Sequence, residues 1–410
     1  MEPYSLPDVI NSWFAVARSE DVAPGTVRAI HLMGHRLVVF RTEDGQLAAM
    51  DGACPHLGGS LAYSGVVEGG VLRCRLHGFC YDGKGACTET GYGTNPPPLQ
   101  ARTYPVRELL GTILIYFHDQ GEAPTFEPPL VDGPEWSRPT HDVFSLTSHP
   151  QEIAENAVDT GHLTWIHGFS EANREGPLQV EGHHVRQAIT CRVPNKLGIG
   201  PAAEIEMRFA FNVFGLGIVL VESQLPAVDF ESRTFVMSSL VGDGTMDVRV
   251  VSQCKDVSRA TSHLPLKWLF PENVAEKLLL TAYHRAMLFD FRRDLAYWAH
   301  KRYLPRPGLA QGDGPIVSFR KWARQYYPGV EVPVLVDQDM PIAQPAPRPR
   351  TKDGKVRLPQ AAPTQGNAEL RTGWWRGVEA LPAPIRSRLG SSGVGAWATL
   401  LGMGSSRVRA

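Results

Sequence analysis

The chain has 410 residues, enough for two domains with a sizeable buried core each. Its 41 lysine and arginine residues balance 42 aspartate and glutamate residues, so the charge gives no reason to expect a nucleic acid or an anionic membrane as partner. No apolar run approaches the roughly 20 residues of a membrane-spanning helix, and the N-terminus lacks the basic and apolar regions of a secretory signal.

Residues 1–120 are predicted to form an all-β domain of short strands and turns. Three runs rich in β-branched and aromatic side chains, with Gly, Asp and Pro between them, indicate its strands: Val38–Phe40, Val71–Leu72 and Thr112–Phe117. The proline-rich segment Glu122–Pro129 then marks the start of a second domain, predicted over residues 121–340.

Two mixed pairs of one cysteine and one histidine lie in the first domain, in Cys54-Pro-His56 and Cys74-Arg-Leu-His77. Two such pairs supply the two thiolates and two imidazoles of a Rieske [2Fe–2S] centre, with the cysteines on one iron and the histidines on the other. Zinc also accepts two cysteines and two histidines, but finger-type spacing places both cysteines in one pair. We therefore predict a [2Fe–2S] cluster, with zinc as the alternative.

The remaining cysteines show no disulfide framework. They are predicted to be free thiols in a reducing cytoplasm, although two of them flank a turn at residues 82–85 and would form the alternative pair. These residues are Cys80 and Cys87, which flank the turn, and Cys191 and Cys254.

The second domain is predicted to combine an antiparallel sheet with helices. A helical segment is expected near residues 151–167, a long amphipathic helix over Glu272–Arg302 and a short helix over Ser318–Tyr327. The alternating, β-branched stretches that would form the sheet are His184–Val193, Ala203–Val221, Arg233–Leu240 and Met246–Gln253. Composition then predicts a disordered linker over residues 341–371, and a tail over residues 372–410 with one or two helices.

The predicted helical segment contains two histidines that suit a metal site. Asp159 and His162 are three residues apart and share a helical face, whereas His167 is five residues further on and would leave that face. The helix is therefore predicted to end or distort near residues 165–167, with Gly168 as its C′ residue. With one more carboxylate, the two imidazoles would form the facial triad of non-haem Fe(II) oxygenases. A satisfied polar face is the alternative, and the upstream cluster motif favours the metal.

Together these motifs resemble those of the Rieske non-haem iron oxygenases. The order Asn156-x2-Asp159-x2-His162-x4-His167 is similar to the catalytic iron motif of that family. The resemblance implies that His162 and His167 bind iron. It also implies that Asp159 bridges His162 to the cluster ligand His77 of the partner subunit.

The third iron ligand is expected on the long helix. The segment from Asp294 to Lys301 resembles the Asp-x-x-Ile-Trp-x-x-Lys segment of the sterol-acting branch, whose aspartate binds iron. Asp294 is favoured on that match. Asp290, one turn earlier, is the alternative, and it would otherwise pair with Arg293 at i+3.

Several other polar or glycine-rich signals are interpreted structurally. Tandem histidines at the start of a strand are predicted to lie on the surface, two helix histidines to be surface or packing residues, and two Gly-x-Gly runs to be hairpin turns rather than dinucleotide fingerprints. These are, in that order, His183 and His184, His284 and His300, and the runs Gly215–Gly217 and Gly242–Gly244.

Two further segments are similar to those of the steroid branch of the family. Residues 149–156 look like the corresponding approach in cholesterol 7-desaturases, and residues 313–327 look like the tail of ketosteroid hydroxylase oxygenase components. The resemblance implies an α+β chain: an all-β Rieske domain followed by a helix-grip, START-like domain with a curved antiparallel sheet and long helices. It also implies a homotrimer.

The activity implied is oxidation, by hydroxylation or desaturation, of a hydrophobic substrate of steroid type, with O2 and a mononuclear Fe(II). No nucleotide-binding motif is present, so electrons from NAD(P)H are expected through a separate reductase, with or without a ferredoxin. An oxidative cyclase acting on an alkyl-pyrrole is one alternative. A Rieske electron carrier without oxygenase activity is the other.

Overall fold

The structure is a computed structural model that describes residues 6–131, 133–195, 202–242, 244–256 and 272–329, apart from the side chains of residues 272–276, 278 and 279. The predicted linker and C-terminal tail lie outside the described residues. Among the residues that the structure describes, no helix is both long and apolar enough to cross a membrane.

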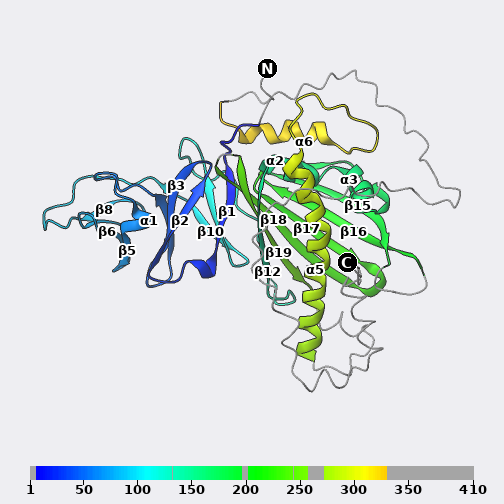
Figure 1. The fold of residues 1–410 in the computed structure, drawn as a ribbon, viewed down its shortest axis with the longest axis horizontal. Coiled ribbons are helices and arrows are strands. Elements are labelled where there is room, and N and C mark those ends of the chain that lie inside the picture. Colours follow the sequence, from blue (N-terminus) through cyan, green and yellow to red (C-terminus); the bar gives the residue numbers. More distant parts are fainter. Residues whose placement is uncertain (1–5, 132, 196–201, 243, 257–271, 330–410) are drawn as a thin grey trace, which may run out of the picture. The chain divides into compact units, whose positions relative to one another are not determined.

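The N-terminal part is built from three small sheets, as the β-rich runs predict (Figure 1). The first sheet has the order β1 (Ser12–Arg18), β11 (Thr112–Phe117), β10 (Val106–Leu109). The second has the order β2 (Thr26–Leu32), β3 (His35–Arg41), β4 (Leu47–Asp51), β9 (Thr103–Tyr104). The third has the order β5 (Gly65–Glu68), β6 (Val71–Cys74), β7 (Phe79–Tyr81), β8 (Cys87–Glu89), and α1 (Leu61–Ser64) precedes it.

The second part centres on one eight-stranded sheet, and the strand pairs described for it are antiparallel. Its strands are β12 (Thr140–Thr147), β13 (Ser170–Arg174), β14 (Gln179–Glu181), β15 (His184–Pro194), β16 (Glu204–Phe214), β17 (Ile218–Leu225), β18 (Phe230–Gly242) and β19 (Thr245–Cys254). They lie in the order β12-β19-β18-β17-β16-β15-β13, and β14 also pairs with β15. The α+β class with an antiparallel catalytic sheet is therefore confirmed.

The predicted β-rich stretch Ala203–Val221 contains β16, a turn and the start of β17. Gly215 has a positive φ of 60°, which favours glycine and lets the chain reverse. Gly217 leaves no room for a side chain, since a Cβ there would lie 2.1 Å from the carbonyl oxygen of Trp13. The predicted hairpin at these glycines is correct, as is the one at Gly242–Gly244, which joins β18 and β19.

The prediction of one helical segment over residues 151–167 needs correction, since two helices are present. α2 (Pro150–Asn156) starts with proline at its first position, where the missing N–H is not needed. α3 (Thr160–Trp165) begins after Asp159, whose backbone is extended and whose carboxylate accepts the His162 N–H at 3.3 Å. Such a cap stabilises a new helix start and so divides the segment earlier than predicted. Gly168 has the expected positive φ, 74°.

The other predicted helices are confirmed. α5 (Glu272–His300) crosses one face of the large sheet and contacts β12 and β19, while α6 (Ile316–Ala323) packs on α2 (Figure 1). The opposite face of the sheet packs on the first small sheet through an apolar cluster that includes Trp13, Leu114 and Phe235. The eight-stranded sheet therefore joins the two parts of the chain, because each of its faces has its own apolar cluster.

The histidines interpreted as structural all have partners. His183 and His184 are half-buried rather than exposed, because they stack on Phe126 and Phe214 with ring centroids 4.6 and 4.4 Å apart. His284 is a packing residue, and its ring nitrogens lie 2.6 Å from Asp142 Oδ2 and 3.0 Å from the Thr140 hydroxyl. His300 is exposed.

The four cysteines outside the two Cys–His motifs are free thiols, so the alternative Cys80–Cys87 disulfide is not formed. Burial raises the pKa of Cys80 to about 11, and that of Cys191 and Cys254 to about 12. These three side chains therefore remain protonated near neutral pH and behave as small packing residues.

An arginine whose side chain is 11% exposed links the large sheet to β1. The pairing of β1 with β11 shifts register between Ala15 and Ala17, and this bulge leaves two strand carbonyls outside the ladder. Arg249 on β19 donates to both, with distances of 2.9 Å to the carbonyl oxygen of Ala15 and 2.9 Å to that of Val16. The guanidinium thus satisfies groups that would otherwise be buried without a partner.

Replacing Arg249 by Met should therefore lower the free energy of unfolding by about 3 kcal/mol, since two charge-assisted hydrogen bonds are lost. Urea denaturation followed by circular dichroism would measure it. Arg28→Met is the matched control, because Arg28 is exposed and forms only a surface ion pair with Asp21 at 3.5 Å. Equal effects of the two substitutions would contradict the role given to Arg249.

Candidate metal centres and family

The two Cys–His motifs form adjacent loops in the third small sheet and beside it. In the first loop the Cys54 N–H bonds to the Gly59 carbonyl at 2.8 Å, and in the second the Gly78 N–H bonds to the Cys74 carbonyl at 2.8 Å. Gly78 has a φ of 72°, and a Cβ there would lie 2.5 Å from the Cα of Gly91, so only glycine fits. Close backbone packing thus shapes the second loop.

The four side chains of these motifs divide into a buried and an exposed half. Cys54 and Cys74 are each 2% exposed, whereas His56 and His77 are half-exposed with ring centroids 4.8 Å apart. No three of their donor atoms lie within 4.8 Å of one another, as the ligands of a single tetrahedral ion would. This arrangement fits a binuclear cluster with its cysteine-bound iron inside and its histidine-bound iron near the surface.

Two hydroxyl groups that the sequence did not single out lie against the cysteine sulfurs. The Tyr81 hydroxyl is 3.2 Å from Cys54 Sγ, and the Ser64 hydroxyl is 3.5 Å from Cys74 Sγ. When the sulfurs are thiolates, these hydroxyls are the donors, and such hydrogen bonds raise the reduction potential of a cluster. No local motif marks Tyr81 or Ser64, because the pairing of β6 with β7 and the turn through α1 bring them to the sulfurs.

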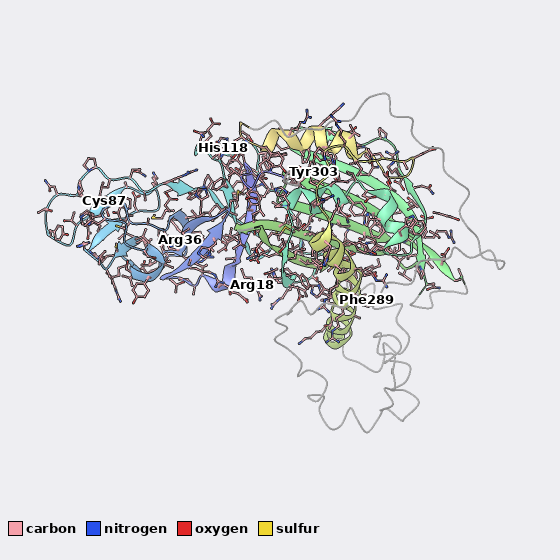
Figure 2. The ribbon with its side chains drawn as sticks, turned by 45° about the horizontal axis from the view of Figure 1, so that its top comes forward. Arg18, Arg36, Cys87, His118, Phe289 and Tyr303 are labelled. Atoms are coloured by element: carbon pink, nitrogen blue, oxygen red, sulfur yellow. The ribbon has the colours of Figure 1, made fainter. Side chains whose placement is uncertain are left out.

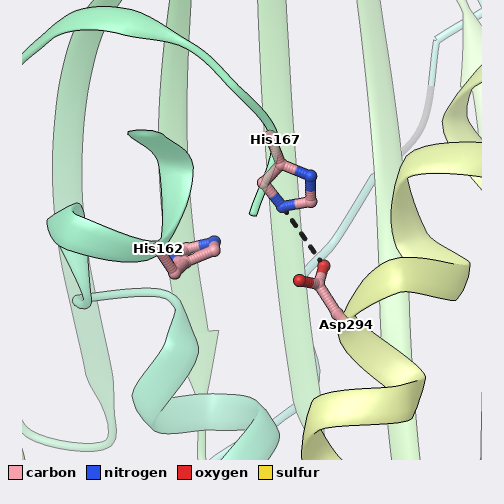
Figure 3. Close-up of side chains that lie close together, drawn as sticks. All are labelled: His162, His167 and Asp294. Carbon is pink, nitrogen blue, oxygen red and sulfur yellow. Dashed lines mark ion pairs between the residues drawn. The ribbon is translucent and has the colours of Figure 1, made fainter. Parts of the chain in front are cut away.

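The second site brings together two histidines of the α3 segment and one carboxylate of α5 (Figure 3). Ligand atoms of His162, His167 and Asp294 all lie within 4.8 Å of one another, and they form the one such group among the described residues. His167 Nε2 is 3.3 Å from Asp294 Oδ2, and both side chains are less than 10% exposed. Asp290 lies apart from this group, half-buried, with Arg293 3.8 Å away.

This group fits a divalent iron ion on two observations. Asp294 Oδ1 and His167 Nδ1 are buried without a hydrogen-bond partner, which is costly for polar atoms unless a cation or water supplies the missing interaction. The donor set of two imidazoles and one carboxylate is that of the facial triad, which leaves coordination positions open. Burial also lowers the pKa of His162, so its imidazole is in the neutral form that binds metals.

Asp159 contacts His162 differently from the prediction. The atom that faces His162 Nδ1 is the backbone carbonyl of Asp159, at 2.5 Å, while the carboxylate accepts from the backbone N–H of His162. This carbonyl accepts from Nδ1–H and so fixes the tautomer in which the lone pair is on Nε2, the nitrogen that would face an ion. Asn156 lies on the other side, with Nδ2 3.2 Å from His162 Nε2. Burial raises the pKa of Asp159, whose half-exposed side chain remains available to a further partner.

Solved structures share this fold. Dicamba monooxygenase, in a complex with 3,6-dichlorosalicylic acid, matches 77% of this chain and 96% of its own, with a TM-score of 0.54 and 18% identity. NdmA of Pseudomonas putida CBB5, in a complex with caffeine, matches 76% of this chain and 89% of its own, with a TM-score of 0.54 and 20% identity. These likenesses show the fold of this chain, a β domain followed by a domain with an antiparallel sheet.

Family models place the chain more closely. The Rieske [2Fe-2S] domain matches residues 12–105, and the 3-ketosteroid 9alpha-hydroxylase C-terminal domain matches residues 115–327, more than half of the chain. The chain belongs to the family of Rieske oxygenases that carry this C-terminal domain.

Two relatives are similar to this chain over most of its length. A cholesterol 7-desaturase of Hemicentrotus pulcherrimus is 26% identical over 338 residues, which cover 78% of this chain and 71% of the relative. A probable 3-ketosteroid-9-alpha-monooxygenase oxygenase component of Rhodococcus rhodochrous is 28% identical over 336 residues, which cover 78% and 80%. The protein is an oxidoreductase with a [2Fe–2S] cluster and a mononuclear iron, and its electrons come from a partner reductase or ferredoxin. The membership therefore favours the oxygenase over the two alternatives, a zinc site at the Cys–His motifs and an electron carrier without oxygenase activity.

Replacing His162 or Asp294 by Ala should lower the iron content from about three to about two atoms per chain, because one of the three converging donor groups is removed while the Cys–His motifs are unchanged. Metal analysis would give the content, and visible absorption would report the cluster. Asp290→Ala is the control and should keep about three iron atoms. Unchanged iron in both ligand variants would contradict this site.

Proposed function

We propose that this chain oxidises a steroid, by hydroxylation or desaturation, at a mononuclear iron held by His162, His167 and Asp294. The convergence of these three buried groups within 4.8 Å carries the proposal. The substrate class is inferred from the relatives, which are named cholesterol 7-desaturase and 3-ketosteroid-9-alpha-monooxygenase component. A row of aromatic rings supports an apolar substrate: Phe169 lies 5.5 Å from the His167 ring, and Phe209 stacks on Phe169 at 5.9 Å.

When bound, the iron would supply the chemistry by which O2 takes up two electrons and two protons. In hydroxylation a C–H bond becomes C–OH and one water is released, and in desaturation the substrate loses two hydrogens and two waters are released. The residues of the chain would orient the ligands and exclude water. The Asp159 carbonyl orients His162, the apolar rings keep water from the substrate side, and Asn156 lies against the His162 ring.

We further propose Cys54, His56, Cys74 and His77 as the cluster ligands. The proposed domains run over residues 1–120 and 121–340. The proposed location is the cytoplasm, which the four free thiols support.

A homotrimer is the proposed assembly, with Asp159 bridging to His77 of the partner subunit. Exposed apolar side chains support an association between copies. Leu57, Leu76 and Tyr92, near the histidines of the Cys–His motifs, are 70%, 57% and 59% exposed. Trp165, on α3, and Tyr297, three residues after Asp294 on α5, are 55% and 58% exposed. Head-to-tail contacts between different surfaces of one chain give a ring when the rotation closes.

The substrate proposal predicts product formation with steroids. The iron-loaded protein would be supplied with a ferredoxin, a ferredoxin reductase and NADH, and offered cholesterol, 3-ketosteroids, small aromatic acids and alkyl-pyrroles, with mass spectrometry as the readout. We expect one added oxygen or the loss of two hydrogens on a steroid. Ring closure of an alkyl-pyrrole would establish the cyclase instead, and oxidation of an aromatic acid alone would exclude the steroid.

Asp159→Ala should keep both metal centres and lower turnover by about 100-fold, because the link between the centres is lost while the ligands stay. Asp159→Asn retains an acceptor for the α3 cap but no charge, so the two variants together separate capping from bridging. Iron content and single-turnover oxidation of the reduced cluster would be measured. Full activity in both variants would refute the bridge.

A further inference from the structure

Two acidic and two basic side chains meet between α2, the C-terminal end of α5 and α6. We call them the ion network: Glu152, Glu155, Lys301 and Arg320. Arg320 forms a two-pronged pair with Glu155, with Nε–Oε2 and Nη2–Oε1 distances of 2.6 and 2.9 Å. Lys301 Nζ lies 2.6 Å from Glu152 Oε2 and 3.5 Å from Glu155 Oε1. The two glutamate side chains are at most 5% exposed.

Aromatic and backbone groups complete the surroundings of the network. The ring of Tyr303, labelled in Figure 2, lies 4.4 Å from the Arg320 guanidinium, which also donates to the Leu304 carbonyl at 2.6 Å. Burial raises the pKa of Glu152, against the opposing effect of the Lys301 charge. Without that ammonium, Glu152 would be a buried acid with no cation in contact.

The network joins α2 to the C-terminal end of α5, the helix that carries Asp294. Lys301 directly follows the last residue of α5, and its N–H still donates to the Tyr297 carbonyl at 2.8 Å, as in a helix. It lies seven residues, about two helical turns, after Asp294, so both side chains leave the same side of the helix. On α2, Glu152 and Glu155 precede Asn156, whose amide nitrogen is 3.2 Å from His162 Nε2. The Lys301–Glu152 contact therefore ties the helix of the carboxylate ligand to the helix that touches a histidine ligand.

Three members of the network are buried, whereas the Lys301 side chain is 40% exposed. Such a network is a poor source of stability, because desolvation offsets much of the attraction within the buried pair and solvent screens the exposed ammonium. Its particular property is geometry. An ammonium contacting two carboxylates, and a guanidinium that matches one of them with two bonds, hold their helices in one register, whereas apolar contacts allow sliding.

We propose that Lys301 is a positioning residue for the mononuclear iron, because its contacts with α2 set the separation of Asp294 from His162. This inference rests on the proposed ligand set. It adds a residue about 10 Å along the helix from the nearest ligand, a distance given by the helical rise over seven residues.

The test uses the full chain with its cluster, and it needs no substrate. Lys301→Met should weaken Fe(II) binding by at least about 10-fold in a chelator competition, and it should change the electron paramagnetic resonance spectrum of the nitric oxide adduct at the iron. Lys301→Arg keeps a cation that reaches both glutamates and should restore both readouts. Lys321→Met, on the exposed side of α6, is the matched control and should leave both unchanged.

A double variant separates positioning from stability. Glu152→Gln combined with Lys301→Met removes both charges of the pair, so thermal stability should return towards that of the wild type. Positioning predicts that Fe(II) binding stays weak and the nitric oxide spectrum stays altered in this double variant. If Fe(II) binding and the nitric oxide spectrum recover together with stability in the double variant, the proposal is wrong. It is also wrong if Lys301→Met itself has the Fe(II) affinity and the spectrum of the wild type. If Lys301→Met does not fold, the double variant decides.

A failure of the positioning role can be distinguished from a failure of the proposed ligand set. If His162→Ala binds Fe(II) as the wild type does, the site itself is misplaced. If His162→Ala loses the ion and Lys301→Met binds it normally, only the positioning role is wrong.

Discussion

The convergence of His162, His167 and Asp294 is the constraint on which the rest of the catalytic part depends. Three groups that normally bind water are held within 4.8 Å of one another and almost wholly buried. Such an arrangement is unfavourable without a cation, because Asp294 Oδ1 and His167 Nδ1 have no protein partner. The surrounding elements keep it: a capped helix start at Asp159 turns His162 inward, and α5 presents Asp294 from the other side.

The eight-stranded sheet explains how one chain supports two kinds of centre. One face packs on β1 and β11 of the Rieske part, and the other carries α5 and contacts α2. Because each face has its own apolar cluster, the iron site is built on an element that is covered on both sides. Arg249 reinforces the joint by satisfying the carbonyls that the β1 bulge leaves free.

The two centres differ in their relation to solvent, and this difference suits electron transfer. The two cysteines of the Cys–His motifs are buried and the two histidines are half-exposed among exposed apolar residues, so a cluster held there would exchange electrons on the histidine side. The mononuclear site is buried and has aromatic neighbours, which suits oxidation of a C–H bond away from water. Asp159 lies at the half-exposed margin of that site, where a group outside the chain can reach it.

Local spacing in the sequence was sufficient to predict the Cys–His motifs, the histidine pair, the β-rich first part and the long helix, because each depends on neighbours within a few turns or strands. It did not predict the break at Asp159, since a side-chain cap outweighed the apparent helical period. Nor did it mark Tyr81, Ser64 or the ion network, whose partners come from other elements. Only tertiary packing decided which aspartate of α5 meets the histidines, because their segments are more than 120 residues apart and the sequence contains no distance between them.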